Sequence, residues 1–144
     1  MNEPRTTSDS LSKEPQVLTE VNRKRKIFVF SPDRDLAQSL SLLFENHFEI
    51  TCETSMGNLG KQIATVAPDL LIVDLHTFSS DVMLELSIVE ASCVKVPVVI
   101  LRAYNRLRSD VEEMVQRTAK VVFYKPFNAE EVVRSINSLT TADS

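Results

Sequence analysis

Ala67-Pro68-Asp69-Leu70-Leu71-Ile72-Val73-Asp74-Leu75 is a turn signal followed by an apolar run that ends on a carboxylate. Five of the six residues from Leu70 onward are apolar, which predicts a strand buried on both faces, as in a parallel sheet covered by helices. An ionised aspartate in the middle of such a strand would be costly to desolvate. At the carboxyl end of the strand it can face a crevice, where open α/β sheets place their functional sites. Asp74 is therefore the first candidate functional residue.

The composition is that of an ordinary globular domain. The chain has 144 residues, of which 43% are hydrophobic and 25% are charged, and its net charge is −4. This charge gives no general attraction for nucleic acid or for an anionic membrane surface. The apolar runs are as short as strands, so no membrane span is predicted. Cys52 and Cys93 have no partner at metal-ligand spacing, and we expect buried free thiols in a cytoplasmic protein without a secretory signal.

Polarity divides the chain into three parts. Residues 1–23 are rich in Ser, Thr, Glu and Pro and have no hydrophobic period, which predicts a disordered tail. Residues 24–140 form the predicted domain, and residues 141–144 form a short C-terminal tail. The basic run at residues 23–26 is more typical of a solvated strand entry than of a nucleic-acid contact.

Strand and helix patterns alternate through the predicted domain. Apolar segments at residues 27–30, 48–54, 98–101 and 121–124 are expected to be strands, in addition to the one that ends at Asp74. Helical stripes follow each strand. Ser31 or Asp33 can cap the first helix, and Asn128 followed by Glu131 resembles a capping box at the start of the last. The (βα)5 order predicts a parallel sheet with helices on both faces.

An aspartate that ends the third strand and Lys125-Pro126-Phe127 at the end of the fifth make the chain resemble a response-regulator receiver (CheY-like) domain. The resemblance covers roughly residues 24–139. It implies a flavodoxin-like, doubly wound sheet with strand order 2-1-3-4-5, in which the ends of strands one, three and five converge.

The resemblance also implies a function in two-component phosphorelay signalling rather than an enzymatic one. Asp74 would accept a phosphoryl group from a histidine kinase or a phosphotransfer protein, and Lys125 would pair with the phosphoryl oxygens. Mg²⁺ would be held by an acidic pair, Asp74 and the main-chain carbonyl of His76. A downstream protein would bind the face made by strand four, helix four, strand five and helix five, which would include Arg106, Arg108 and Tyr124, and a homodimer stays open.

Several positions depart from the family pattern. Ser31-Pro32 stand where the acidic pair belongs, which leaves Asp33 as the nearby carboxylate and reduces the Mg²⁺ site to Asp33, Asp74 and the His76 carbonyl. Arg102 stands at the Ser/Thr switch position of strand four. Val122 stands at the aromatic switch position of strand five, although Tyr124 lies on the same face of that strand.

Arg102 leaves two alternatives equally open. It could hold Asp74 together with Lys125, which would make the domain a phosphate-independent pseudo-receiver that acts as a protein-interaction module. It could instead point to solvent with Arg106 and Arg108. A third, less favoured hypothesis is a flavodoxin-like binder in which Arg102 and Lys125 hold a small anionic ligand. Glu112 and Glu113 are expected on a solvated helix face.

Overall fold

The computed structural model describes residues 24–75, 79–92 and 95–141, so the tail predicted for residues 1–23 lies outside the described residues, as do residues 142–144. In chain order, the described elements are β2 (Arg25–Phe30), α2 (Arg34–Phe44), β3 (Phe48–Glu53), the short 3-10 helix η1 (Met56–Asn58), α3 (Leu59–Val66), β4 (Leu70–Asp74), α4 (Ser79–Ser92), β5 (Val98–Arg102), α5 (Ser109–Thr118), β6 (Val121–Tyr124) and α6 (Ala129–Thr141).

The five strands form one parallel sheet in the order β3-β2-β4-β5-β6. This is the predicted 2-1-3-4-5 order, and it confirms the flavodoxin-like topology. β4 lies at the centre, and all five of its residues are buried, including the terminal aspartate. The site expected at the end of β4 therefore lies between the first and third strands of the chain, where the winding of the sheet reverses.

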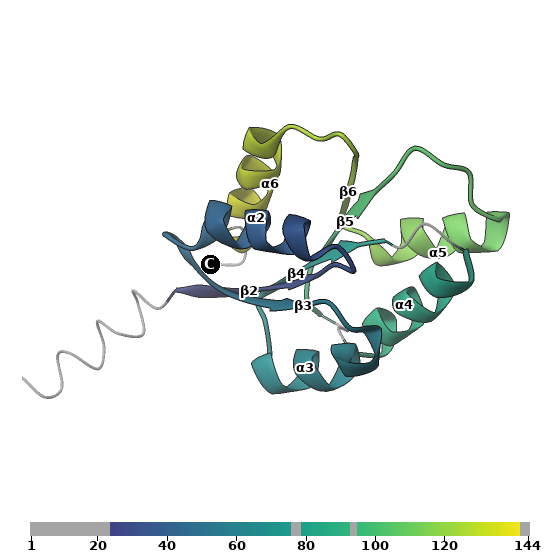
Figure 1. Ribbon diagram of the computed structural model, residues 1–144, viewed down its shortest axis with the longest axis horizontal. Helices are drawn as coiled ribbons and strands as arrows, with labels where there is room; N and C mark the ends of the chain where they lie inside the picture. Colours follow the sequence, from purple (N-terminus) through teal and green to yellow (C-terminus); the bar gives the residue numbers. More distant parts are fainter. Residues whose placement is uncertain (1–23, 76–78, 93–94, 142–144) are drawn as a thin grey trace, which may run out of the picture.

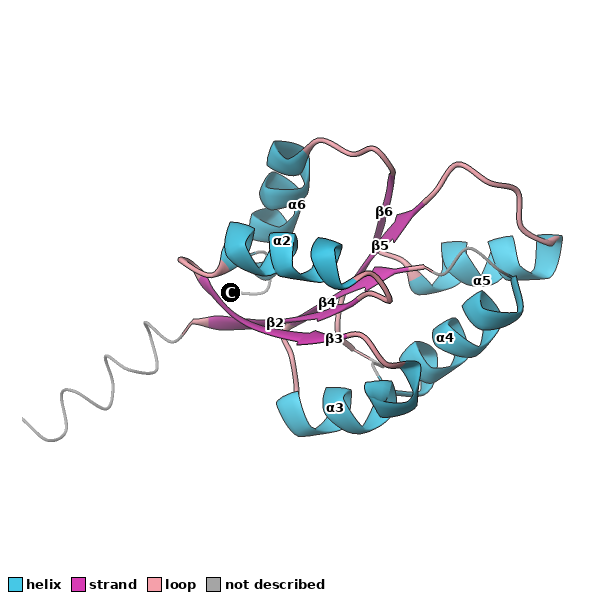
Figure 2. Cartoon of the chain, viewed as in Figure 1, coloured by secondary structure: helices cyan, strands magenta, loops and turns pink. Residues whose placement is uncertain are grey.

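Helices cover both faces of the sheet (Figures 1 and 2). α2 and α6 pack on one face, and α3, α4 and α5 pack on the other. Side chains alternate along β4 and so contribute to the cores on both faces. Leu70 and Ile72 pack on the side of α2 and α6, and Leu71 and Val73 pack on the side of α3, α4 and α5. The continuous apolar run of β4 thus has a direct explanation, since every position along it meets a helix layer.

Local signals set the helix boundaries near the site. The Asp33 side chain caps α2 by accepting hydrogen bonds from the main-chain N–H groups of Asp35 and Leu36. Ala67 ends α3 in the left-handed conformation, with a φ of 51°, and its N–H bonds to the Ile63 carbonyl. Pro68 follows directly, so the helix cannot continue and the chain turns into β4.

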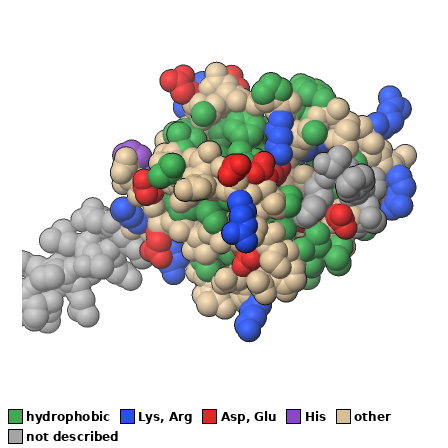
Figure 3. Space-filling view, viewed as in Figure 1, with side chains coloured by type: hydrophobic (Ala, Val, Ile, Leu, Met, Phe, Trp, Pro, Cys, Tyr) green, Lys and Arg blue, Asp and Glu red, His purple; other side chains and the backbone are tan. Residues whose placement is uncertain are grey.

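The surface of the described residues differs from the sequence prediction at one cysteine. Cys52 was expected to be buried but is exposed, because β3 is an edge strand paired only with β2; Cys93 lies outside the described residues. Within residues 24–75, 79–92 and 95–141, no helix is long and apolar enough to cross a membrane. Acidic and basic side chains are interspersed on the face shown in Figure 3.

Candidate functional site

The ends of the first, third and fifth strands of the chain bring three side chains together. Asp74, the last residue of β4, is 1% exposed. Its Oδ1 pairs with Lys125 Nζ at 2.5 Å, and its Oδ2 accepts a hydrogen bond of 2.7 Å from the Ser31 hydroxyl. Lys125 follows β6, and its main-chain N–H donates to the Arg102 carbonyl at 2.8 Å, which ties the β6 end to β5.

Ser31 is buried and bonded through both its main chain and its side chain. The residue is fully buried directly after β2, and its main-chain N–H donates to the Glu53 carbonyl at 3.1 Å. Its Oγ accepts from the Asp33 N–H at 3.0 Å, and its hydroxyl proton has two acceptors within reach, Asp74 Oδ2 at 2.7 Å and the Asp33 carbonyl at 3.2 Å, of which the charged Asp74 oxygen is the nearer. Both carboxylate oxygens of Asp74 are therefore engaged by groups of the chain itself, one by a cation and one by a neutral hydroxyl.

The carboxylates predicted to hold Mg²⁺ already contact other groups of the chain. Asp33 Oδ1 is used in the cap of α2, its side chain is exposed, and the Asp74 oxygen on the β2 side is bonded to Ser31. Within the described ranges, no group of three or more His, Cys, Asp or Glu side chains could hold a metal ion. His76, whose carbonyl was predicted as a third ligand, lies outside the described residues. Magnesium is commonly held by one or two carboxylates together with water and phosphate oxygens, and Asp33 and Asp74 are the two carboxylates that the described residues bring to the predicted site, which stays a prediction.

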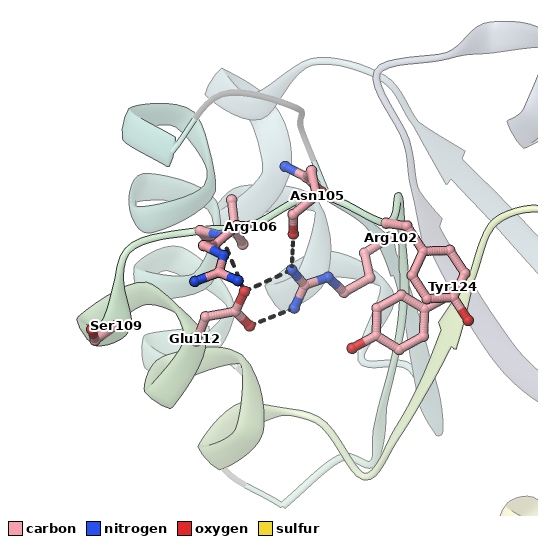
Figure 4. Close-up of a pocket in the computed structure, with 8 residues that line it drawn as sticks. Arg102, Asn105, Arg106, Ser109, Glu112 and Tyr124 are labelled. Carbon is pink, nitrogen blue, oxygen red and sulfur yellow. Dashed lines mark hydrogen bonds and ion pairs between the residues drawn. The ribbon is translucent and has the colours of Figure 1, made fainter.

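Both predicted positions of Arg102 are wrong. Arg102 is 3% exposed and does not hold Asp74. Its guanidinium makes a two-pronged pair with Glu112 of α5, at 2.7 and 2.9 Å, and also donates to the Asn105 carbonyl at 3.0 Å (Figure 4). Glu112 additionally accepts from the Leu107 N–H at 3.1 Å, so it does not belong to a solvated helix face.

Hydrogen bonding across this pair shifts both pKa values. The bonds to Glu112 raise the pKa of Arg102 above its ordinary value, against the opposing effect of burial. The bonds from Arg102, with that from the Leu107 N–H, lower the pKa of the Glu112 carboxyl, again against burial. Each partner favours the charged form of the other, which is why a guanidinium can be tolerated at the buried end of β5.

Two tyrosines complete the surroundings of Arg102, and one of them was missed in the sequence. Tyr104 is 79% exposed, and its ring stacks on that of Tyr124 at a centroid distance of 4.5 Å and an angle of 15°. The Arg102 guanidinium carbon lies 5.3 Å from the centre of the Tyr124 ring. Val122, two residues earlier on the same strand face, is half-buried and packs against the core on the α3, α4 and α5 side. The sequence could have indicated Tyr104 as a candidate site residue, since it lies two residues after an apolar strand that ends on the cation Arg102.

The sequence matches no protein-family model and no curated protein. Solved structures of receiver domains, however, have a similar fold. The receiver domain of a Francisella response regulator is 22% identical with a TM-score of 0.69, and the match covers 84% of this chain and 100% of that one. A CheY-like receiver domain from Methanospirillum hungatei is 13% identical with a TM-score of 0.70, covering 83% and 95%.

The signal receiver domain of a Luxo repressor protein from Vibrio parahaemolyticus is 17% identical with a TM-score of 0.68, over 83% of this chain and 92% of that one. These likenesses agree with the observed strand order. The chain has the fold of the response-regulator receiver (CheY-like) domains.

Proposed function

We propose that the protein is a cytoplasmic signalling module of the receiver type that works through protein contacts without phosphorylation of Asp74. The observation that carries this proposal is the 2.7 Å hydrogen bond from Ser31 Oγ to Asp74 Oδ2. A hydroxyl at this position satisfies the carboxylate and needs no metal ion. Together with Lys125, it gives Asp74 two partners from the chain itself, one at each carboxylate oxygen.

The same geometry disfavours phosphoryl transfer. A carboxylate that attacks a phosphate dianion must accumulate negative charge, and cations are needed to offset it. Here Lys125 is the cation that contacts Asp74. Ser31 stands at a position where the family has an acidic residue, and the nearby carboxylate of Asp33 caps α2. Asp74 is also 1% exposed, so a phosphodonor could approach its carboxylate in line only if the groups that cover it moved.

A phosphorylatable receiver is the second candidate, with a histidine kinase or a phosphotransfer protein as its donor. The Asp74–Lys125 pair favours it, because a lysine at this position is where a phosphoryl oxygen would need a counter-charge. The small-molecule binder has less support, since Arg102 and Lys125 are each paired with a carboxylate of the chain.

Intact-mass spectrometry after incubation with acetyl phosphate, with and without Mg²⁺, tests the proposal. We expect no phosphoryl adduct on the wild-type protein at high Mg²⁺. The double variant Ser31→Asp/Pro32→Asp restores two carboxylates beside Asp74, and we expect it to gain a Mg²⁺-dependent adduct. That gain would show that acetyl phosphate can reach Asp74.

Asp74→Asn serves as the control for the site of modification, and circular dichroism establishes that each variant is folded. A Mg²⁺-dependent adduct on the wild-type protein that is absent from Asp74→Asn would refute the proposal and establish the second candidate.

A further inference from the structure

An open pocket lies at the carboxyl edge of the sheet beside β5 and β6 (Figure 4). Its volume is about 630 Å³. The end of β5, the loop at residues 103–108, the start of α5 and the end of β6 all contribute to it. The lining residues are Arg102, Tyr104, Asn105, Arg106, Leu107, Ser109, Glu112 and Tyr124.

The floor of the pocket is held by the chain itself. Glu112 receives two hydrogen bonds from Arg102 and one from the Leu107 N–H, and Arg102 also donates to the Asn105 carbonyl. These contacts connect β5, the following loop and α5 through one buried guanidinium. None of these side-chain contacts involves Asp74, and the pocket is linked to that residue through Lys125, whose main-chain N–H donates to the Arg102 carbonyl. A site formed before binding loses less conformational entropy when a partner docks.

One wall of the pocket is aromatic. The exposed Tyr104 ring lies flat on Tyr124, which itself lies beside the Arg102 guanidinium. An exposed tyrosine is thus supported by a second ring and a cation rather than left to rotate in solvent. Tyrosine and arginine are the side chains that most often dominate binding energy at protein interfaces.

Among the described arginines around the pocket, Arg106 is the one that forms no ion pair. Arg102 is paired with Glu112, and Arg108 is paired with Asp110 at 3.1 Å. Arg106 is exposed and near enough to Glu112 to contribute to the lowering of its pKa, yet it forms no ion pair within the described residues. The pocket therefore offers one available cation next to an aromatic surface, which is complementary to a carboxylate next to an apolar group.

We propose that this pocket is a preformed docking site for a segment of a partner protein that presents a carboxylate beside an aromatic side chain. The inference rests on the proposed function, because it assigns the protein contact through which a phosphate-independent module would act. The aromatic side chain packs on Tyr104, and the carboxylate pairs with Arg106. Nucleic acid fits less well, because Asp110 and Glu112 lie in the first turn of α5 at the same edge.

NMR titration of the ¹⁵N-labelled protein with a short Gly/Ser peptide that contains Asp-Phe-Asp tests the inference. We expect amide shifts confined to the loop at residues 103–108, the start of α5 and Tyr124. Asn-Phe-Asn and Asp-Ala-Asp versions of the peptide should each bind about tenfold more weakly, since each loses one of the two contacts. Arg106→Gln and Tyr104→Ala should weaken the Asp-Phe-Asp peptide by a similar factor.

Arg108→Gln is the matched control, because that arginine is on the same loop but already paired with Asp110. Its affinity should stay within about twofold of wild type, as expected for an exposed ion pair. Equal weakening by Arg106→Gln and Arg108→Gln would overturn the inference, since it would indicate a diffuse charge effect. Equal pocket shifts with sodium acetate alone would also overturn it, in favour of a small-anion site.

The titration is carried out on wild type and Asp74→Asn without Mg²⁺ or phosphodonor, and then on wild type with both. Absence of pocket shifts under every condition would refute the docking site and leave the mass-spectrometry result unaffected. Pocket shifts that appear only with Mg²⁺ and acetyl phosphate would instead refute the phosphate-independent function, while the pocket would still bind the peptide.

Discussion

At the scale of single residues, the hydroxyl of Ser31 determines how the Asp74 carboxylate is stabilised. A carboxylate at the same position would repel Asp74 and would require a cation between the two. The serine instead donates a hydrogen bond of 2.7 Å and carries no charge. Asp74 is therefore buried beside one cation, Lys125, and one neutral donor, Ser31.

Removal of that hydroxyl tests its contribution. Ser31→Ala leaves Asp74 Oδ2 without the Ser31 donor in a buried site, and we expect the free energy of unfolding to fall by about 1–3 kcal/mol. Urea denaturation measures the change. Ser39→Ala, at an exposed position of α2, is the control and should stay within about 0.5 kcal/mol of wild type. A Ser31→Ala variant as stable as wild type would mean that the hydrogen bond does not contribute to folding.

At the scale of secondary-structure elements, one ion pair joins the end of β5 to α5 across the loop at residues 103–108. Arg102 is almost completely buried, whereas the Glu112 side chain is 34% exposed. Loss of the acid would leave a buried cation without its counter-ion. The loop, the pocket and the packing of Tyr124 all depend on the same contact.

Glu112→Gln should therefore destabilise the protein in a pH-dependent way. Because the folded pKa of Glu112 is lowered below its ordinary value of 4.5, its contribution is fully present above that pH and is lost as pH falls through the folded pKa. At neutral pH we expect a loss of about 1–3 kcal/mol, less than for a fully buried pair because the carboxylate is partly solvated. The difference between wild type and variant should narrow below pH 4.5.

Urea denaturation of both proteins at a series of pH values measures this difference. Asp110→Asn, which breaks the exposed pair with Arg108, is the control and should leave the stability close to that of wild type, because solvent screens an exposed pair. A constant gap between wild type and Glu112→Gln at all pH values would rule out the charge of Glu112 as the cause.

The elements and their order could be predicted from the sequence because each depends on a local pattern. The apolar run before Asp74 predicts a central strand, and Asp33 and Asn128 mark helix starts that the structure confirms through side-chain caps. The meeting of Asp74 and Lys125 also follows, since parallel strands end at the same edge.

The partner of Arg102 could not be predicted in the same way. Strand patterns place Arg102 at an edge that several acidic residues can reach, and periodicity does not say which one the loop brings near. The path of the loop at residues 103–108 brings Glu112 next to Arg102, and that path depends on tertiary packing. The same holds for Ser31, where the residue type shows the loss of an acid but not the direction of its hydroxyl.

At the scale of the whole molecule, two helix layers depend on one sheet, and β4 contributes equally to both. Leu71 faces α3, α4 and α5, while Ile72 faces α2 and α6, and both are fully buried. Consecutive residues of one strand therefore belong to the two different cores. We infer that they unfold as one cooperative unit, as small single domains generally do.

Truncation of either side chain tests this inference. Leu71→Ala and Ile72→Ala should each reduce the free energy of unfolding by about 2–5 kcal/mol, because each opens a cavity in one of the two layers. Circular dichroism and tyrosine fluorescence should give coincident urea transitions in both variants. Leu42→Ala, at a position 60% exposed on α2, is the control with little expected change. Transitions that separate in one variant would show that the layers unfold independently.

The pairing of Asp74 with Ser31 and Lys125 has a consequence for the information that the molecule can carry. A switch reports through the fraction of its copies in each of two states, and a chemical modification sets that fraction. Under the phosphate-independent function proposed above, the module would have one dominant state, and its concentration would then be the quantity that its partners detect. The cell would then regulate it by the rates of its synthesis and degradation, and its partners would respond to dose rather than to a covalent mark.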